Sequence, residues 1–303
     1  MGTVITTDSL TKTYGKKDVV KDLDLRVPGG SIYGFLGPNG AGKSTTMKMI
    51  LGLIKPSKGE ITVLGKEVNE KNRLSVLRNT GSLIEAPSYY GHLSGVENLE
   101  IICTLKNVPL SEIQRVLKIV RMEKQKDKKV SQYSLGMKQR LGIAVALAGD
   151  PDFLVLDEPI NGLDPQGIIE MRELILKLNR EHQITVLISS HILDELSRLA
   201  THYGFIDQGH IVKEISAEEL ENACRKCTRV KVSDTVMLAK VLDGMSIDYD
   251  IISESEADIY KEVNVSELSL ALAKEGASII SMSERDESLE SYFISLVGGG
   301  SRD

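Results

Sequence analysis

Alternating apolar and polar positions predict β-strands over residues 4–10 and 19–27, which we expect to pair antiparallel before a Pro-Gly-Gly turn at 28–30. A further strand over 31–36 runs directly into a glycine-rich loop. Helical spacing of apolar residues then extends over 46–53. The start of the chain therefore has the order strand, glycine loop, helix.

The middle of the chain is predicted to form a helical insert over about residues 87–148. Apolar residues recur there at spacings of three and four, over 96–105, 111–122 and 135–148. Two short apolar strands follow at 153–156 and 184–188, separated by an amphipathic helix at 168–178. This strand, helix, strand order is typical of a parallel sheet, so the predicted core is α/β.

A different pattern begins near residue 216. Short strands are predicted over 229–232, 247–252, 259–263 and 278–282, with helices over 236–242 and 265–274. The glycine-rich stretch 298–301 predicts a flexible tail. Because the chain has 303 residues and domains average roughly 150, we predict a large domain over 1–215 and a small α+β domain over 216–303.

Charge is distributed unevenly between these two parts. Residues 216–303 carry 9 basic and 18 acidic side chains, whereas the whole chain carries 37 and 43, a net charge of −6. The first part is therefore slightly basic and the second clearly acidic. This balance argues against a protein that coats nucleic acid or lies on anionic lipid.

Cysteine usage and hydropathy indicate the compartment. Three cysteines cannot form a disulfide framework, so we expect a reducing environment. Cys224 and Cys227 lack a second pair or nearby histidines, and no metal is assigned to them. Residues 1–13 are polar and predict no secretory signal, and no apolar stretch approaches the roughly 18 residues that span a bilayer. Any membrane role must therefore come through a partner.

The glycine-rich loop matches the phosphate-binding pattern G-x-x-x-x-G-K-[ST]. Glycines let successive backbone N–H groups converge on phosphates, Lys43 would neutralise β- and γ-phosphate charge, and Ser44 would offer its hydroxyl to Mg²⁺. The flanking strand and helix disfavour the alternative, a chance glycine turn. The residues expected to hold the nucleotide are Gly37, Pro38, Asn39, Gly40, Ala41, Gly42, Lys43, Ser44 and Thr45.

Two carboxylates, Asp157 and Glu158, end the apolar strand over 153–156. Ligands of parallel sheets bind at the carboxyl ends of strands. We expect Asp157 to hold the Mg²⁺ shell and Glu158 to orient or deprotonate the attacking water. The alternative is a solvated Asp-Glu turn before Pro159. The presence of the phosphate-binding glycine loop in the same chain disfavours it.

Together with Ser189-Ser190-His191 after the strand at 184–188, these motifs make the chain resemble the nucleotide-binding subunit of an ABC transporter over residues 3 to about 215. The resemblance implies that His191 contacts the γ-phosphate, that Asp164 belongs to the D-loop at 161–165, and that Tyr14 stacks on adenine. Taken alone, His191 could be structural and Tyr14 could be a packing residue.

The family signature Leu-Ser-Gly-Gly-Gln is present in altered form at 133–137, with Ser134 and Gly136 kept and Leu135 in place of a glycine. The resemblance implies that this segment reaches the ATP held by a second subunit. Hydrolysis is then expected only from a dimer, of this chain with itself or with a close paralogue. A serine at the helix start keeps the anion-binding character of that segment.

Glu85 stands where the family usually has glutamine, and it is expected to join the Mg²⁺ ligands. With the altered signature, this resembles the subgroup of bacitracin-resistance and lantibiotic-immunity transporters. The resemblance implies an ATP-hydrolysing exporter subunit at the inner face of the cell membrane, cytoplasmic, joined to separate membrane subunits through about residues 85–98. The extension over 216–303 is similar to that of drug and peptide exporters, and propping the dimer is favoured over sensing a ligand.

An alternative function is a soluble ABC-type ATPase acting on a ribosome, DNA or an assembly partner. The chain has one ATPase unit, no long coiled-coil heptads and no strongly basic face, all of which argue against it. A nucleotide kinase would have no use for the segment at 134–140. The sequence therefore favours the transporter subunit, with no nucleic-acid partner.

Overall fold

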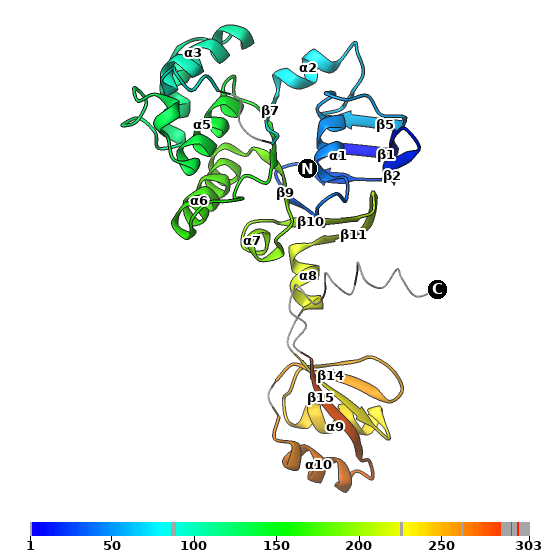
Figure 1. Cartoon of the computed structure of the whole chain (residues 1–303). Coiled ribbons are helices and arrows are strands. Elements are labelled where there is room, and N and C mark those ends of the chain that lie inside the picture. Colours follow the sequence, from blue (N-terminus) through cyan, green and yellow to red (C-terminus); the bar gives the residue numbers. More distant parts are fainter. Residues whose placement is uncertain are drawn as a thin grey trace. The chain divides into compact units, whose positions relative to one another are not determined.

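The computed structural model describes residues 2–85, 89–224, 227–261, 263–285, 292 and 296. The chain divides into two compact units, Met1–Ala217 and Glu218–Asp303 (Figure 1). The predicted tail at 298–301 and residue 87, the predicted start of the insert, lie outside the described residues. Within the described part of the chain, no helix is long and apolar enough to cross a membrane.

A six-stranded mixed sheet forms the centre of the first unit, in the order β11-β10-β4-β9-β8-β7. Five strands are parallel and β11 is antiparallel to β10. All residues of β4, β8 and β9 are buried, as expected for parallel strands covered on both faces. The strands are β4 (Ile32–Leu36), β7 (Thr80–Leu83), β8 (Phe153–Asp157), β9 (Thr185–Ser190), β10 (His202–Asp207) and β11 (His210–Ser216).

A second, antiparallel sheet has the order β2-β1-β5-β6, with β3 also paired to β1. A common core that includes Ile5, Val27, Phe35 and Leu187 joins it to the central sheet. Its strands are β1 (Thr3–Tyr14), β2 (Lys17–Leu23), β3 (Arg26–Pro28), β5 (Lys58–Val63) and β6 (Lys66–Glu67).

The prediction of one strand over 19–27 was wrong, because the segment is interrupted between β2 and β3. The Thr7 hydroxyl donates to the Leu23 carbonyl and accepts the Leu25 N–H, and these bonds take the place of regular ladder pairs. Residue Asp22 has a positive φ of 44°. Both features bend the chain at this point.

The helical insert is confirmed by α3 (Gly95–Lys106), α4 (Ser111–Ile119) and α5 (Leu135–Leu147). Ser94 and Glu97 form a reciprocal capping box that fixes the start of α3. Helix α4 ends at Ile119 and not at residue 122 as predicted, and Arg121 then adopts a positive φ of 57°. The other helices of this unit are α1 (Lys43–Ile50), α2 (Arg73–Arg78), the short 3₁₀ helix η1 (Val130–Gln132), α6 (Pro165–His182) and α7 (Leu193–Ser197).

The second unit contains an antiparallel four-stranded sheet in the order β13-β14-β12-β15, with two helices between the strands along the chain. This β-α-β-β-α-β order is that of the split βαβ, or ferredoxin-like, arrangement. Its core is built on Val230, Leu242, Ile259 and Leu272. The elements are β12 (Cys227–Val232), α9 (Thr235–Gly244), β13 (Tyr249–Ile251), β14 (Glu256–Ile259), α10 (Val265–Lys274) and β15 (Ile279–Arg285), preceded by α8 (Ala217–Ala223).

The strand predicted over 259–263 was wrong, since β14 spans Glu256–Ile259. The pairing of β14 with β12 buries Ala257 and Ile259 in the core, whereas Lys261 is exposed. Acidic residues at 254, 256 and 258 had hidden this alternation in the sequence.

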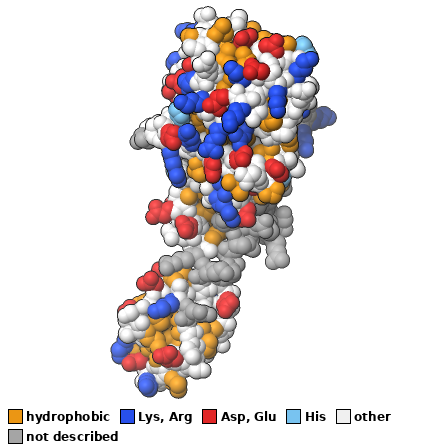
Figure 2. All heavy atoms as spheres, turned by 90° about the vertical axis from the view of Figure 1, so that its left-hand side faces the viewer, with side chains coloured by type: hydrophobic (Ala, Val, Ile, Leu, Met, Phe, Trp, Pro, Cys, Tyr) orange, Lys and Arg blue, Asp and Glu red, His pale blue; other side chains and the backbone are white. Residues whose placement is uncertain are grey.

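Basic and acidic side chains alternate with apolar ones over the face of the first unit that Figure 2 shows. Neither charge sign covers that face alone.

Candidate functional site

The glycine-rich loop connects β4 to α1 at the carboxyl end of the central sheet. A Cβ atom on Gly37 would lie 2.3 Å from the Ile206 carbonyl oxygen, and one on Gly42 would lie 2.8 Å from the Val19 carbonyl oxygen. Gly42 also has a φ of +110°, which L side chains rarely adopt. Helix α1 begins at Lys43, three residues earlier than predicted, so the loop ends directly on a helix N-terminus.

Lys43 is 6% exposed and lies inside this loop. Its Nζ donates to the carbonyls of Gly37, at 2.7 Å, and Pro38, at 3.2 Å. It also lies 3.8 Å from Glu158 Oε1. Burial lowers the pKa of Lys43, and the negative charges of Glu158 and Asp157 oppose that shift. The ammonium is therefore held at the mouth of the loop by one carboxylate and two carbonyls.

Asp157 and Ser189 are opposite each other in the β8–β9 pair. The Ser189 hydroxyl donates to Asp157 Oδ1 at 2.5 Å and accepts the backbone N–H of Glu158 at 3.0 Å. Asp157 is only 7% exposed, and Glu158 has a positive φ of 47°. The end of β8 thus places two carboxylates in different surroundings, one buried and one partly exposed.

The Glu158 side chain contacts two residues that are distant in the sequence, Lys43 and His191, and one nearby residue, Asn161. Besides Lys43, its Oε2 atom lies 3.1 Å from His191 Nδ1 and accepts a hydrogen bond of 3.1 Å from Asn161 Nδ2. Its side chain is 23% exposed. The fold therefore brings the glycine loop, the strand-end carboxylates and the histidine after β9 into one cluster.

Sequence reasoning missed Glu195 on α7. The Ser190 hydroxyl donates to Glu195 Oε2 at 3.4 Å, and burial raises the pKa of this carboxyl. Its only signal in the sequence is the acidic pair Asp194-Glu195, three and four residues after the histidine, on a helix too short to show a periodicity.

Glu85 lies two residues beyond β7 in the left-handed region, with a φ of +60°. Its Oε1 atom is 2.5 Å from Lys48 Nζ on α1. The glutamate side chain is 66% exposed and the lysine side chain 31%. Lys48 was not singled out in the sequence, because a lysine in the last turn of a helix is common.

Tyr14 ends β1 and is 51% exposed, so its ring is not part of the core. Lys12 Nζ lies 5.1 Å from the ring centroid. The arrangement leaves an aromatic ring available at the surface for stacking.

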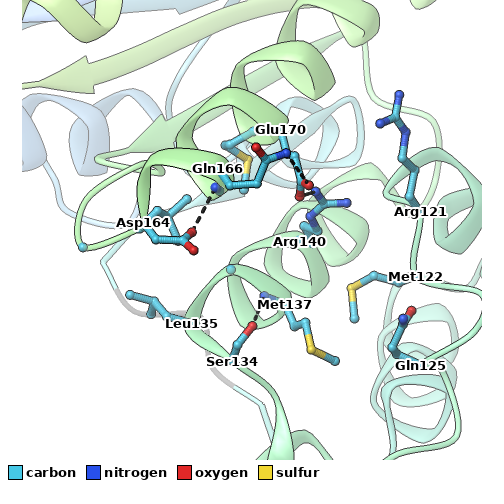
Figure 3. A pocket seen from close by; sticks show the side chains of 15 residues that line it. Arg121, Met122, Gln125, Ser134, Leu135, Met137, Arg140, Asp164, Gln166 and Glu170 are labelled. Atoms are coloured by element: carbon cyan, nitrogen blue, oxygen red, sulfur yellow. Dashed lines mark hydrogen bonds and ion pairs between the residues drawn. The ribbon is translucent and has the colours of Figure 1, made fainter.

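The altered signature lies at the start of α5, where the Ser134 hydroxyl accepts the Met137 N–H at 3.3 Å. Asp164 caps α6 in the same way by accepting the Gly167 N–H at 2.9 Å. The two helix starts line one cavity of about 520 Å³ (Figure 3), and a Cβ atom on Gly162 would lie 3.1 Å from Leu135. Ser134, Gly136 and Asp164 thus form a second cluster.

Comparison with known proteins identifies the class. The family model described as ABC transporter matches residues 20–161. Over 98% of its length, the chain is 43% identical to the bacitracin transport ATP-binding protein BcrA of Enterococcus faecalis, covering 97% of that protein. It is 42% identical to BcrA of Bacillus licheniformis, with 99% of each chain covered. The lantibiotic transport ATP-binding protein SrtF of Streptococcus pyogenes is 43% identical over 71% of this chain and 91% of its own length.

Solved structures agree with this class. An ATP-binding subunit of an ABC transporter superposes with a TM-score of 0.64 at 26% identity, covering 73% of this chain and 92% of that one. A dimeric bacterial ABC transporter cassette gives a TM-score of 0.64 at 25% identity over 70% and 98%.

The chain belongs to the ATP-binding subunits of ABC transporters. It is an ATP-binding, ATP-hydrolysing protein with the α/β P-loop core that the sequence predicted. The alternative of a soluble ATPase that acts on a ribosome, DNA or an assembly partner is not favoured by these matches.

Proposed function

We propose that this protein drives the export of bacitracin or a similar amphipathic peptide antibiotic through separate membrane subunits. The observation that carries this proposal is the match to two bacitracin transport proteins over almost the whole chain, second unit included. The lantibiotic relative matches over 214 residues, close to the length of the first unit alone. For this reason bacitracin is favoured over a lantibiotic as the cargo.

We assign the ATP phosphates to the backbone N–H groups of residues 37–45 and to Lys43. The oxygen donors around this loop fit Mg²⁺, which prefers hard carboxylate and hydroxyl ligands. Asp157 is buried and held by Ser189, Ser44 lies in the first turn of α1, and Glu85 is the third candidate ligand. Bound Mg²⁺ would neutralise charge on the β- and γ-phosphates.

Glu158 is proposed as the group that orients the attacking water and accepts its proton as the water oxygen bonds to the γ-phosphorus and ADP leaves. Its contacts with Lys43, His191 and Asn161 support this role by fixing the carboxylate beside the phosphate loop. His191, whose Nδ1 atom lies 3.1 Å from Glu158 Oε2, is proposed to contact the γ-phosphate.

Two copies of the chain are proposed to share two ATP molecules. The cluster of Ser134, Gly136 and Asp164 would contact the nucleotide bound at the other copy's glycine loop, through the open N-terminus of α5. Tyr14, half exposed beside Lys12, would stack on the adenine of its own nucleotide.

A cavity of about 340 Å³ between the end of β7 and helices α3 and α5 is proposed to receive the membrane subunit. Its lining is largely apolar and includes Leu53 and Tyr90, which are 49% and 55% exposed. Such docking would hold the protein at the inner face of the cell membrane. Residues 1–215 would form the ATPase domain and 216–303 an extension that props the dimer.

The cargo is tested by replacing the chromosomal gene with a Glu158→Gln variant. The inhibitory concentrations of bacitracin and of a lantibiotic are then compared with those of the parent strain. The proposal predicts a several-fold fall for bacitracin and little change for the lantibiotic. A fall for the lantibiotic alone, or for neither compound, would refute bacitracin as the cargo.

A further inference from the structure

The ion pair between Lys48 and Glu85 joins the helix of the phosphate loop to the end of β7. The two charged atoms are 2.5 Å apart, and both side chains are partly exposed to solvent. Exposed ion pairs contribute little to stability and exchange readily. Glu85 has a backbone φ of +60°, which non-glycine residues adopt infrequently.

The position of Lys48 on α1 relates this pair to the phosphate loop. Ser44 and Lys48 are four residues apart in one helix, so they lie on the same helix face with their Cβ atoms about 5–6 Å apart. Lys48, and with it the Glu85 carboxylate that it binds, is therefore on the helix face that also carries the hydroxyl assigned to the metal.

The strand order relates Glu85 to the phosphate loop. Glu85 follows β7 and Asp157 ends β8, and these two strands are paired in the central sheet. The phosphate loop lies at the same edge of this sheet, with Lys43 as its buried cation. Lys48 pairs with Glu85 and supplies a second cation.

We propose that Lys48 is a positioning residue for Glu85, and that its ammonium competes with Mg²⁺ for this carboxylate. The inference rests on the metal site assigned under the proposed function. In this structure Glu85 is bound to Lys48. When Mg²⁺ binds with the nucleotide, the carboxylate leaves the lysine for the metal.

The test measures binding of a fluorescent, non-hydrolysable ATP analogue, mant-AMPPNP, in EDTA and in excess MgCl₂. The ratio of the two Kd values reports how much the metal adds to nucleotide affinity. Lys48→Met removes the competitor and is expected to raise this ratio about two- to five-fold, the range expected for an exposed ion pair. Lys48→Arg keeps the pair and is expected to keep the wild-type ratio.

The decisive comparison repeats Lys48→Met in a Glu85→Gln background, where no carboxylate is left to release. The ratio is expected not to change there. An equal rise in both backgrounds would mean that Lys48 acts on the charge of the nucleotide, and would overturn the inference, as would no rise in either. Lys118→Met is the matched control, because Lys118 also lies in the last turn of a helix and has no ion pair within the described residues.

A wild-type ratio of one would show that the metal adds nothing to binding. That result would refute the metal site and this inference together. A wild-type ratio well above one that is insensitive to Lys48 would refute the inference alone.

Discussion

Ser189 donates a hydrogen bond of 2.5 Å to the Asp157 carboxylate across the β8–β9 pair, and its oxygen accepts the Glu158 N–H at 3.0 Å. One hydroxyl thus holds both acidic residues at the end of β8. It fixes the buried carboxylate directly and the turn of Glu158 through the backbone. The geometry of the proposed metal ligand and of the proposed base therefore depends on a residue of the neighbouring strand.

Replacing this hydroxyl should damage both stability and turnover. Ser189→Ala leaves a buried carboxylate without its donor, which costs about 1–3 kcal/mol, and releases the Glu158 turn. Urea unfolding and ATPase assays would measure the two effects. Ser190→Ala removes a hydroxyl from the same strand that does not contact Asp157 or Glu158, and it should retain more turnover. Equal losses in the two variants would contradict the special role of Ser189.

Glu158→Gln keeps the shape of the side chain and removes its basicity. We expect the variant to bind ATP with near-normal affinity and to lose at least about 100-fold in turnover, because positioned general bases contribute about 10²–10⁴. Nucleotide titration and phosphate release measure the two quantities. Hydrolysis at the wild-type rate would show that the base has been assigned to the wrong residue.

Tyr14→Ala should weaken ATP binding about five- to 150-fold, because a stacking contact with a base contributes about 1–3 kcal/mol. Tyr14→Phe retains the ring and should bind almost as tightly as the wild type. Fold stability should hardly change in either variant, since the ring is half exposed. Equal affinity in the alanine and phenylalanine variants would rule out stacking.

Glu112 connects α4 to the end of α5, because it binds Arg115, whose guanidinium also donates to the Leu147 carbonyl. Hydrogen bonds from Arg115, the charge of that residue and the Gly149 N–H lower the pKa of Glu112 from 4.5, against the opposing effect of burial. Its stabilisation is therefore present above the unfolded-state pKa and lost as pH falls through the folded-state pKa.

Glu112→Gln should accordingly lower the free energy of unfolding by about 1 kcal/mol at pH 7. The difference from wild type should shrink below pH 4.5 as the wild-type carboxyl is protonated. Urea unfolding at pH 7 and near pH 3.5 tests this. A difference of the same size at both pH values would contradict the charge-dependent role.

The elements that the sequence predicted best have strong periodicity and clear caps. Helix α10 was expected over 265–274, and the structure places it at Val265–Lys274, where Asn264 caps it by accepting the N–H groups of Ser266 and Glu267. Strand β5 was missed, since its first three residues, a lysine, a glycine and a glutamate, are exposed and its formation depends on pairing with β1. Pairing between strands that are far apart in the sequence cannot be predicted from the local pattern of apolar and polar residues.

The same distinction applies to the site. The glycine loop is contiguous, so its spacing alone indicated phosphate binding. The contacts of Glu158 with Lys43 and His191, and of Glu85 with Lys48, depend on the order of strands in the central sheet. The sequence identifies such residues as candidates, but it does not show which of them contact one another.

The most direct test of the whole account is purification of the chain from its native membranes in mild detergent, with identification of what accompanies it by mass spectrometry. We predict a stoichiometric hydrophobic polypeptide with membrane-spanning segments and, in reconstituted vesicles, ATP hydrolysis that rises when bacitracin is added. Recovery of the chain alone, or with ribosomes or DNA, would contradict its assignment as the ATPase of a peptide-antibiotic exporter.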